Sequence, residues 1–100
     1  MVKVMITRRI KPGKIKELMG YLNQLRTGAI HQSGWVSAEF LYSQDDRRKM
    51  VVVCTWESKR QWERWRDDPV RKTLENKIER FLVEPATYET FSYRSPKRAA

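Results

Sequence analysis

Along this chain the spacing of apolar residues switches between two positions, as in a strand, and three or four positions, as in a helix. The order of these switches restricts the fold more than any other feature. In residues 2–10 apolar and polar side chains alternate, which is typical of a strand with one buried face. Pro12 and Gly13 interrupt this alternation. Residues 14–30 then predict a helix, because apolar residues recur every three or four positions and form one stripe. The stripe contains Ile15, Leu18, Met19, Leu22, Leu25, Ala29 and Ile30.

Two more strands are predicted after this helix. Residues 35–43 are rich in aromatic and other strand-favouring side chains. Residues 44–48 are polar and predict a turn. Residues 49–56 contain the run Met-Val-Val-Val-Cys-Thr-Trp. Because β-branched residues dominate this short run, it fits a central strand better than a helix.

A second helical region follows, and its beginning has a recognisable signature. Ser58 and Gln61 match a capping box, in which each side chain satisfies a backbone donor of the first helical turn. Asp68 and Pro69 interrupt the region, and this dipeptide fits a helix restart and a helix end equally well. Pro85 stops the pattern, residues 87–93 predict a last strand, and we expect residues 95–100 to be a disordered tail. The apolar stripe comprises Trp62, Trp65, Val70, Leu74, Ile78, Phe81 and Leu82.

The predicted order, β-α-β-β-α-β, is that of an α+β, ferredoxin-like fold. Such a fold has a four-stranded antiparallel sheet with two helices on one face. The other face should carry Met5, Thr7 and Arg9 together with aromatic and aliphatic residues of the remaining strands. A sheet face with large apolar residues and no helix needs a partner or a ligand. We therefore expect a homodimer that packs sheet against sheet.

Length and composition agree with one small globular domain, which we place at residues 1–94. The chain has 100 residues, and 40% of them are hydrophobic. The longest uncharged stretch, residues 27–38, is well short of the roughly 20 residues of a membrane span. Arg8, Arg9 and Lys11 stand where a signal peptide would need its apolar region. We therefore expect a cytoplasmic protein that does not contact a membrane.

The charge balance favours an anionic partner. The formal net charge is +9, from 21 lysines and arginines against 12 acidic residues. Acidic residues are interleaved with the basic ones, and Arg47, Arg48 and Lys49 form one of only a few short basic runs. We therefore expect a small anionic molecule rather than nucleic acid. With one cysteine, Cys54, and one histidine, His31, neither an internal disulfide nor a protein-only zinc site is expected.

Several short segments carry a resemblance to a known family. They are residues 11–14 (Lys-Pro-Gly-Lys), residues 33–35 (Ser-Gly-Trp), where that family usually has Pro-Gly-Phe, and residues 55–59 (Thr-Trp-Glu-Ser-Lys). Trp62, Trp65 and the Asp68-Pro69 pair follow in the second helical region. In this order the segments resemble the antibiotic biosynthesis monooxygenase-type domains of the dimeric α+β barrel superfamily. The resemblance covers about residues 2–93.

The resemblance implies a monooxygenase that needs no cofactor and acts on a small aromatic or polycyclic substrate in a pocket between sheet and helices. In this chemistry the substrate is deprotonated to a phenolate or enolate and supplies the electrons. The protein supplies an apolar pocket, hydrogen-bond donors for the oxyanion and a proton source. We expect Trp65, Tyr42 and Arg9 to be catalytic, with Tyr88 as the alternative proton donor to Tyr42 and Arg8 as the alternative to Arg9 beside the enolate. Substrate contacts are expected from Trp62, Trp56, Thr7, Tyr88 and His31.

Two other functions stay open. Haem-degrading members of the family resemble the chain at Trp65, but where they have a histidine and an asparagine this sequence has Glu75 and Thr7. A carboxylate does not replace a neutral imidazole as an axial donor to haem iron, so haem degradation ranks second. A dimer that binds a small molecule or nucleic acid without catalysis ranks third. In that case the Arg47, Arg48 and Lys49 turn is the best candidate for phosphate contacts.

Each candidate residue also has a purely structural interpretation. Trp65, Trp62 and Trp56 could form an ordinary aromatic cluster in the core. His31 follows the first helix, where the helix dipole favours it. Arg8 and Arg9 point to opposite sides of their strand, so at most one of them can face the pocket. Cys54 lies in the most apolar strand and is expected to be an inert small hydrophobic residue.

Overall fold

The structure is a computed structural model that describes residues 1–94. The predicted order of strands and helices is confirmed, and the second helical region consists of two helices rather than one. The predicted tail at residues 95–100 lies outside the described residues. The elements are β1 (Val2–Arg9), α1 (Ile15–Ile30), β2 (Trp35–Tyr42), β3 (Lys49–Trp56), α2 (Lys59–Arg66), α3 (Pro69–Glu79) and β4 (Thr87–Ser92).

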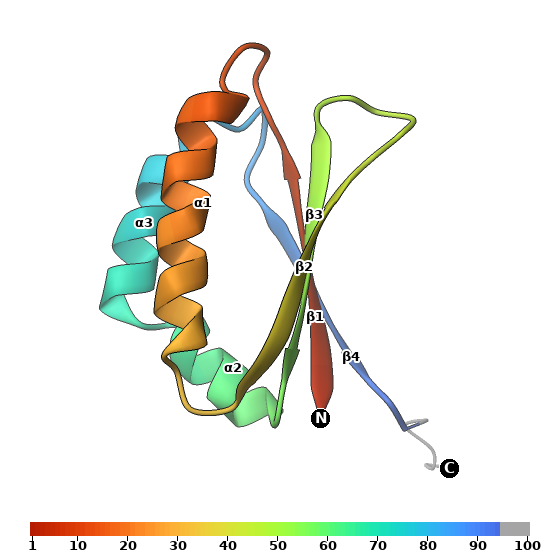
Figure 1. Ribbon diagram of the computed structural model, residues 1–100, viewed down its shortest axis with the longest axis vertical. Coiled ribbons are helices and arrows are strands. Elements are labelled where there is room, and N and C mark those ends of the chain that lie inside the picture. Colours follow the sequence, from red (N-terminus) through yellow and green to blue (C-terminus); the bar gives the residue numbers. More distant parts are fainter. Residues whose placement is uncertain (95–100) are drawn as a thin grey trace.

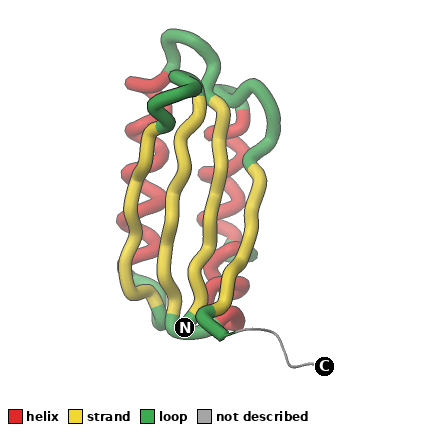
Figure 2. Tube along the Cα trace, turned by 90° about the vertical axis from the view of Figure 1, so that its right-hand side faces the viewer, coloured by secondary structure: helices red, strands yellow, loops and turns green. Residues whose placement is uncertain are grey.

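Within residues 1–94 the strands form one four-stranded antiparallel sheet in the order β2-β3-β1-β4. The helices all lie on the same side of this sheet (Figure 1). Figure 2 shows the opposite side, where the strands lie in front of the helices and nothing covers them. The α+β, ferredoxin-like fold class is therefore confirmed. Among residues 1–94, no helix is long and apolar enough to cross a membrane.

The break between α2 and α3 arises from two capping residues. Ser58 Oγ accepts a hydrogen bond from the backbone N–H of Gln61 at 3.2 Å, which confirms the predicted start of α2. Asp68 Oδ1 accepts one from the backbone N–H of Val70 at 2.8 Å, and Pro69 occupies the first turn of α3. The Asp68-Pro69 pair is thus a restart, because it supplies both an N-cap and a residue that suits the first helical position.

Strand β1 separates the two faces of the sheet. Val4, Ile6 and Arg8 are buried under the helices, whereas Met5, Thr7 and Arg9 alternate with them and face away. Cross-strand neighbours on the buried side are Cys54, Val52 and Met50 of β3, which pair with Val4, Ile6 and Arg8 respectively. The core therefore lies between the sheet and the helices. Its helix side is formed by Leu18, Leu22, Leu25, Trp62, Trp65, Leu74 and Ile78.

The uncovered face mixes apolar and polar side chains. Met5, Leu41 and Phe91 are 37%, 48% and 42% exposed, respectively. Lys3 Nζ donates a hydrogen bond to Thr55 Oγ1 at 2.9 Å across neighbouring strands. The prediction that Met5, Thr7 and Arg9 share this face with apolar residues of other strands is confirmed.

Candidate active site

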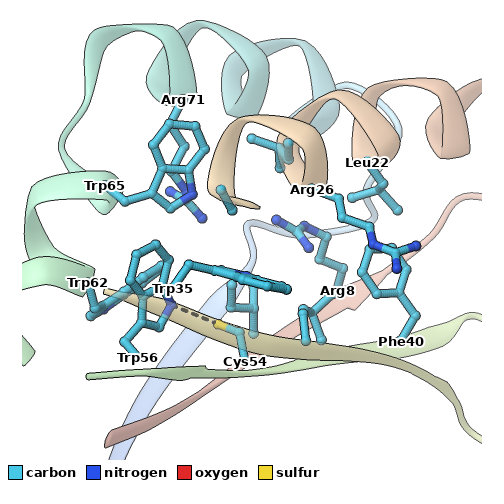
Figure 3. A pocket seen from close by; sticks show the side chains of 15 residues that line it. Arg8, Leu22, Arg26, Trp35, Phe40, Cys54, Trp56, Trp62, Trp65 and Arg71 are labelled. Atoms are coloured by element: carbon cyan, nitrogen blue, oxygen red, sulfur yellow. Dashed lines mark hydrogen bonds between the residues drawn. The ribbon is translucent and has the colours of Figure 1, made fainter. Parts of the chain in front are cut away.

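A pocket of about 50 Å³ lies between the sheet and the helices, and all four tryptophans of the chain line it. Trp35 comes from β2 and Trp56 from β3, while Trp62 and Trp65 come from α2. Figure 3 shows these rings around the inner space, together with side chains from β1, α1 and α3. Together with Phe40 and several aliphatic residues they make the walls largely apolar, which suits a flat apolar molecule.

The tryptophans are held in place by contacts with one another and with α1. The ring centroids of Trp56 and Trp62 are 6.0 Å apart, and those of Trp62 and Tyr88 are 6.2 Å apart. Trp65 lies against the backbone of α1 at Gly28, where a side chain would collide with the indole. Trp56 Nε1 donates a hydrogen bond to Cys54 Sγ at 3.4 Å. These contacts fix the indoles of Trp56, Trp62 and Trp65 in the wall.

Cys54 also lines the pocket, and it is a structural thiol. Its Sγ lies 3.7 Å from the carbonyl oxygen of Val4, to which it donates. Burial raises the pKa of Cys54. The thiol therefore stays protonated near neutral pH and acts as a small apolar residue, as predicted. The aliphatic part of the lining consists of Ile6, Leu22, Leu25, Ala29, Ala38 and Val52.

Two buried arginines bring positive charge into this apolar space. Arg8 is 2% exposed and Arg71 is 4% exposed, and both line the pocket. Both donate to the same oxygen of Glu75: Arg8 Nη2 at 2.7 Å and Arg71 Nη2 at 2.8 Å from Oε2. Tyr88 Oη donates to this oxygen at 3.3 Å and accepts from Arg71 Nη2 at 3.2 Å. Two guanidinium groups thus share one carboxylate.

The aromatic rings hold Arg71 from two sides. Its guanidinium carbon lies 5.2 Å from the ring centroid of Trp62 and 5.4 Å from that of Tyr88. Both distances fit cation–π contacts, which are stronger for a desolvated cation. Arg8 is less well satisfied, because its buried Nε has no hydrogen-bond partner among the described residues. Figure 3 shows the Arg8 side chain reaching from β1 into the space between sheet and helices.

The pocket opens between α1 and the edge strand β2. There the lining residues are less buried: Arg26 is exposed, and Ala29, Trp35, Ala38 and Phe40 are only partly buried. The Arg26 guanidinium carbon lies 5.9 Å from the ring centroid of Phe40. Because β2 pairs with β3 alone in the sheet of residues 1–94, this side is the least constrained wall of the pocket. Arg26 and Phe40 thus stand at the entrance.

Of the predicted site residues, three tryptophans come together. Trp56, Trp62 and Trp65 line the pocket as expected. Tyr88 stands just behind the lining, in contact with Trp62 and hydrogen-bonded to Arg71 and Glu75. Tyr88 therefore contacts Arg71 but does not itself line the pocket.

The other predicted residues lie elsewhere, and their assignment to the site needs correction. Arg9 and Thr7 belong to the uncovered face, because the alternation of β1 turns Arg8 inward. Arg9 pairs with Asp46 at 3.0 Å and with Glu84 at 3.5 Å. Tyr42 is 52% exposed, and its hydroxyl contacts Met19 Sδ at 3.5 Å. His31 is exposed after the end of α1, with Nδ1 2.8 Å from the carbonyl oxygen of Thr27.

The sequence prediction held Arg8 only as the alternative to Arg9 and missed Arg71 and Glu75 as parts of the site, although the sequence holds a signal for both buried arginines. Arg8 continues the alternating stripe of Val4 and Ile6, so its side chain falls on the buried face. Arg71 likewise stands three and seven residues before Leu74 and Ile78, on the buried stripe of α3. An arginine in an apolar stripe needs a buried anion, which points to a site.

Comparison with known proteins identifies the family. The family model described as antibiotic biosynthesis monooxygenase matches residues 1–76. No curated protein matches the chain. A conserved protein from Methanosarcina mazei has a similar structure, with a TM-score of 0.86, 12% sequence identity, and coverage of 93% of this chain and 92% of the other.

Two further solved structures are similar. Rv0793 from Mycobacterium tuberculosis has a TM-score of 0.82 and 17% identity, with coverage of 96% of this chain and 97% of the other. SnoaB, a cofactor-independent oxygenase from Streptomyces nogalater, has a TM-score of 0.79 and 14% identity, with coverage of 97% of both chains. At such identities the structures support the fold, whereas the family model rests on the sequence of residues 1–76. The chain therefore belongs to the antibiotic biosynthesis monooxygenase family.

Proposed function

We propose that this protein is a monooxygenase that uses no cofactor and oxidises a small aromatic substrate in the tryptophan-lined pocket. The observation that carries the proposal is the joint presence of four tryptophans and two buried arginines around one space. Membership of the family and the similarity to SnoaB, described as a cofactor-independent oxygenase, support it.

The reaction needs a substrate with an acidic C–H or O–H next to an aromatic system. Loss of that proton gives an enolate or phenolate, whose electrons pass to molecular oxygen. When a ring methylene becomes a ketone, one oxygen atom enters the product and the other leaves as water, so the substrate supplies all four electrons. Arg8 and Arg71 take the role that the sequence suggested for Arg9, because their guanidinium groups can stabilise the oxyanion in an apolar surrounding.

The pocket must widen before it can hold such a ring. Its volume is about 50 Å³, whereas benzene occupies an engineered cavity of about 150 Å³. The entrance side chains, Arg26 and Phe40, are the lining residues that can move at least cost, since neither is fully buried and β2 is an edge strand. Substrate entry is therefore expected to displace Phe40 and the Arg26 guanidinium above it.

We also propose that two copies of the chain associate through the uncovered sheet face. Met5, Leu41 and Phe91 are exposed there, and burial of such side chains stabilises an interface. In such a dimer each pocket would remain on the helix side of its own sheet. The pocket and the proposed interface are thus on opposite faces.

Oxygen uptake tests the proposed reaction. The purified protein, treated with a chelator, is mixed with a panel of enolisable aromatic ketones such as anthrone, and oxygen consumption is compared with the rate without protein. We expect one oxygen molecule to be consumed for each substrate molecule whose ring methylene is converted to a ketone. The Arg8→Gln variant should lose most of the acceleration, whereas Arg60→Gln, which changes an exposed arginine of α2, should retain it. A folded protein that binds the panel without accelerating oxygen uptake would support the non-catalytic alternative.

A further inference from the structure

The charges around the pocket do not balance. Arg8 and Arg71 are both buried, and they share the single carboxylate of Glu75. No aspartate or glutamate of the described chain lines the pocket itself, while Arg26 adds a third guanidinium at the entrance. Burial of a cation is unfavourable unless an anion or hydrogen bonds compensate it. The pocket is therefore short of one negative charge.

One donor atom shows where that charge would be bound. Arg8 Nη2 is occupied by Glu75, whereas the buried Nε has no partner among residues 1–94. An unpaired buried N–H loses its hydrogen bonds to water without a replacement. An acceptor oxygen of a ligand in the pocket could restore that bond, because Arg8 is part of the lining. Tyr88 does not satisfy this N–H either: its hydroxyl donates to Glu75 and accepts from Arg71.

We propose that Arg8 forms an anion subsite in this pocket and that the bound molecule is a small aromatic acid whose carboxylate receives the free Nε–H of Arg8. A carboxylate fits because it supplies the missing charge and accepts a charge-assisted hydrogen bond from the Nε–H. The aromatic part of the acid would then lie among Trp35, Trp62 and Trp65. Arg71 is already compensated by Glu75 and by two aromatic rings, so Arg8 carries the uncompensated donor.

This inference rests on the proposed function only in that both place a ligand in the same pocket. It assigns the class of the ligand, an aromatic carboxylate, and not its reaction. The test is therefore a binding measurement in the absence of oxygen, where no turnover occurs. Tryptophan fluorescence is a suitable signal, because all four tryptophans line the pocket.

Two pairs of probes separate charge from shape: benzoate with benzamide, and 2-naphthoate with 2-naphthamide. On the unmodified protein we expect each acid to bind at least about tenfold more tightly than its amide, as a charge-assisted hydrogen bond predicts. This comparison does not depend on whether a variant folds. Equal affinity of acid and amide overturns the inference, as does tighter binding of 2-naphthol than of 2-naphthoate at neutral pH.

Variants locate the subsite. Arg8→Met leaves Arg71 and Glu75 as a one-to-one ion pair, and we expect it to remove the preference for the acid. Arg8→Lys keeps a cation without the Nε–H and should retain only part of that preference. Arg60→Gln lowers the net charge of the protein without touching the pocket and should not change it. If Arg8→Met is folded and still prefers the acid, Arg8 is not the anion subsite.

The two proposals fail in different experiments. If the acids bind preferentially but no enolisable substrate consumes oxygen, the anion subsite stands and the monooxygenase proposal is wrong. If oxygen uptake is found while acid and amide bind equally, the reaction stands and the subsite is wrong.

Discussion

Gly28 of α1 and Trp65 of α2 lie so close together that a β-carbon on Gly28 would stand 2.7 Å from Cη2 of the indole. Only a residue without a side chain permits this approach. Glycine inside a helix costs roughly 0.5–1 kcal/mol relative to alanine. The contact with Trp65 explains why a residue that is unfavourable for the helix stands at this position, because the indole forms a wall of the pocket.

The Gly28→Ala substitution is expected to destabilise the protein by about 1–3 kcal/mol, because the added methyl group forces Trp65 from its place. Urea unfolding, followed by circular dichroism, measures this change. Gly20→Ala is the matched control, since Gly20 belongs to the same helix and a β-carbon there meets nothing within 4 Å. We expect Gly20→Ala to raise the stability by roughly 0.5–1 kcal/mol. Equal effects of both substitutions would contradict the packing argument.

The proposed homodimer predicts a particle of about twice the chain mass of 12.0 kDa in light scattering at micromolar concentration. Leu41→Lys should shift the particle towards the monomer, because it places a charge on the uncovered sheet face, where Leu41 is 48% exposed. Val70→Lys is the control: Val70 is 63% exposed, but it belongs to α3 on the other side of the sheet. A monomeric unmodified protein would show that the sheet face is not the interface.

The buried thiol of Cys54 should react slowly with iodoacetamide in the folded protein and rapidly in urea, because burial keeps it protonated and inaccessible. The raised pKa of Cys54 also makes the free energy of unfolding depend on pH. The unfolded thiol loses its proton first, at about pH 8.5, so the free energy of unfolding should decrease as the pH rises above that value. This part of the pH dependence should be absent in Cys54→Ala. Fast alkylation of the folded protein would indicate that the pocket exposes the thiol.

Haem should not bind tightly to this chain. Glu75 is held by Arg8 and Arg71, Thr7 faces away from the pocket, and His31 is exposed beyond α1. Titration with haem should therefore give no saturable Soret shift, or one that saturates only weakly. Stoichiometric binding with a sharp Soret shift, followed by bleaching with a reductant, would make haem degradation the preferred function.

The sequence alone predicted the order of the strands and helices and the buried side of the first strand and of the helical regions, whereas it left the inward side of the other strands unassigned. The periods of two and of 3.6 residues follow from the backbone geometry of strands and helices. The spacing of apolar residues therefore identifies residues 2–10 as a strand and residues 14–30 as a helix. The caps at Ser58 and Asp68 are also local, because each satisfies donors within its own first helical turn. The same helical period placed Trp62 and Trp65 on the buried stripe, whereas Trp35 was not among the predicted site residues.

The tertiary structure decided how charge is arranged in the site. The alternation of the first strand already placed Arg9 on the uncovered face and therefore Arg8 on the buried one, but it did not show which charged group Arg8 meets there. Arg8 and Glu75 are separated by 67 positions in the sequence, and no local pattern connects them. They meet because α3 lies on the helix-covered side of the sheet (Figure 1), into which Arg8 of β1 points. Periodicity indicates which side of an element is buried, whereas the pairing of buried charges depends on which elements pack together.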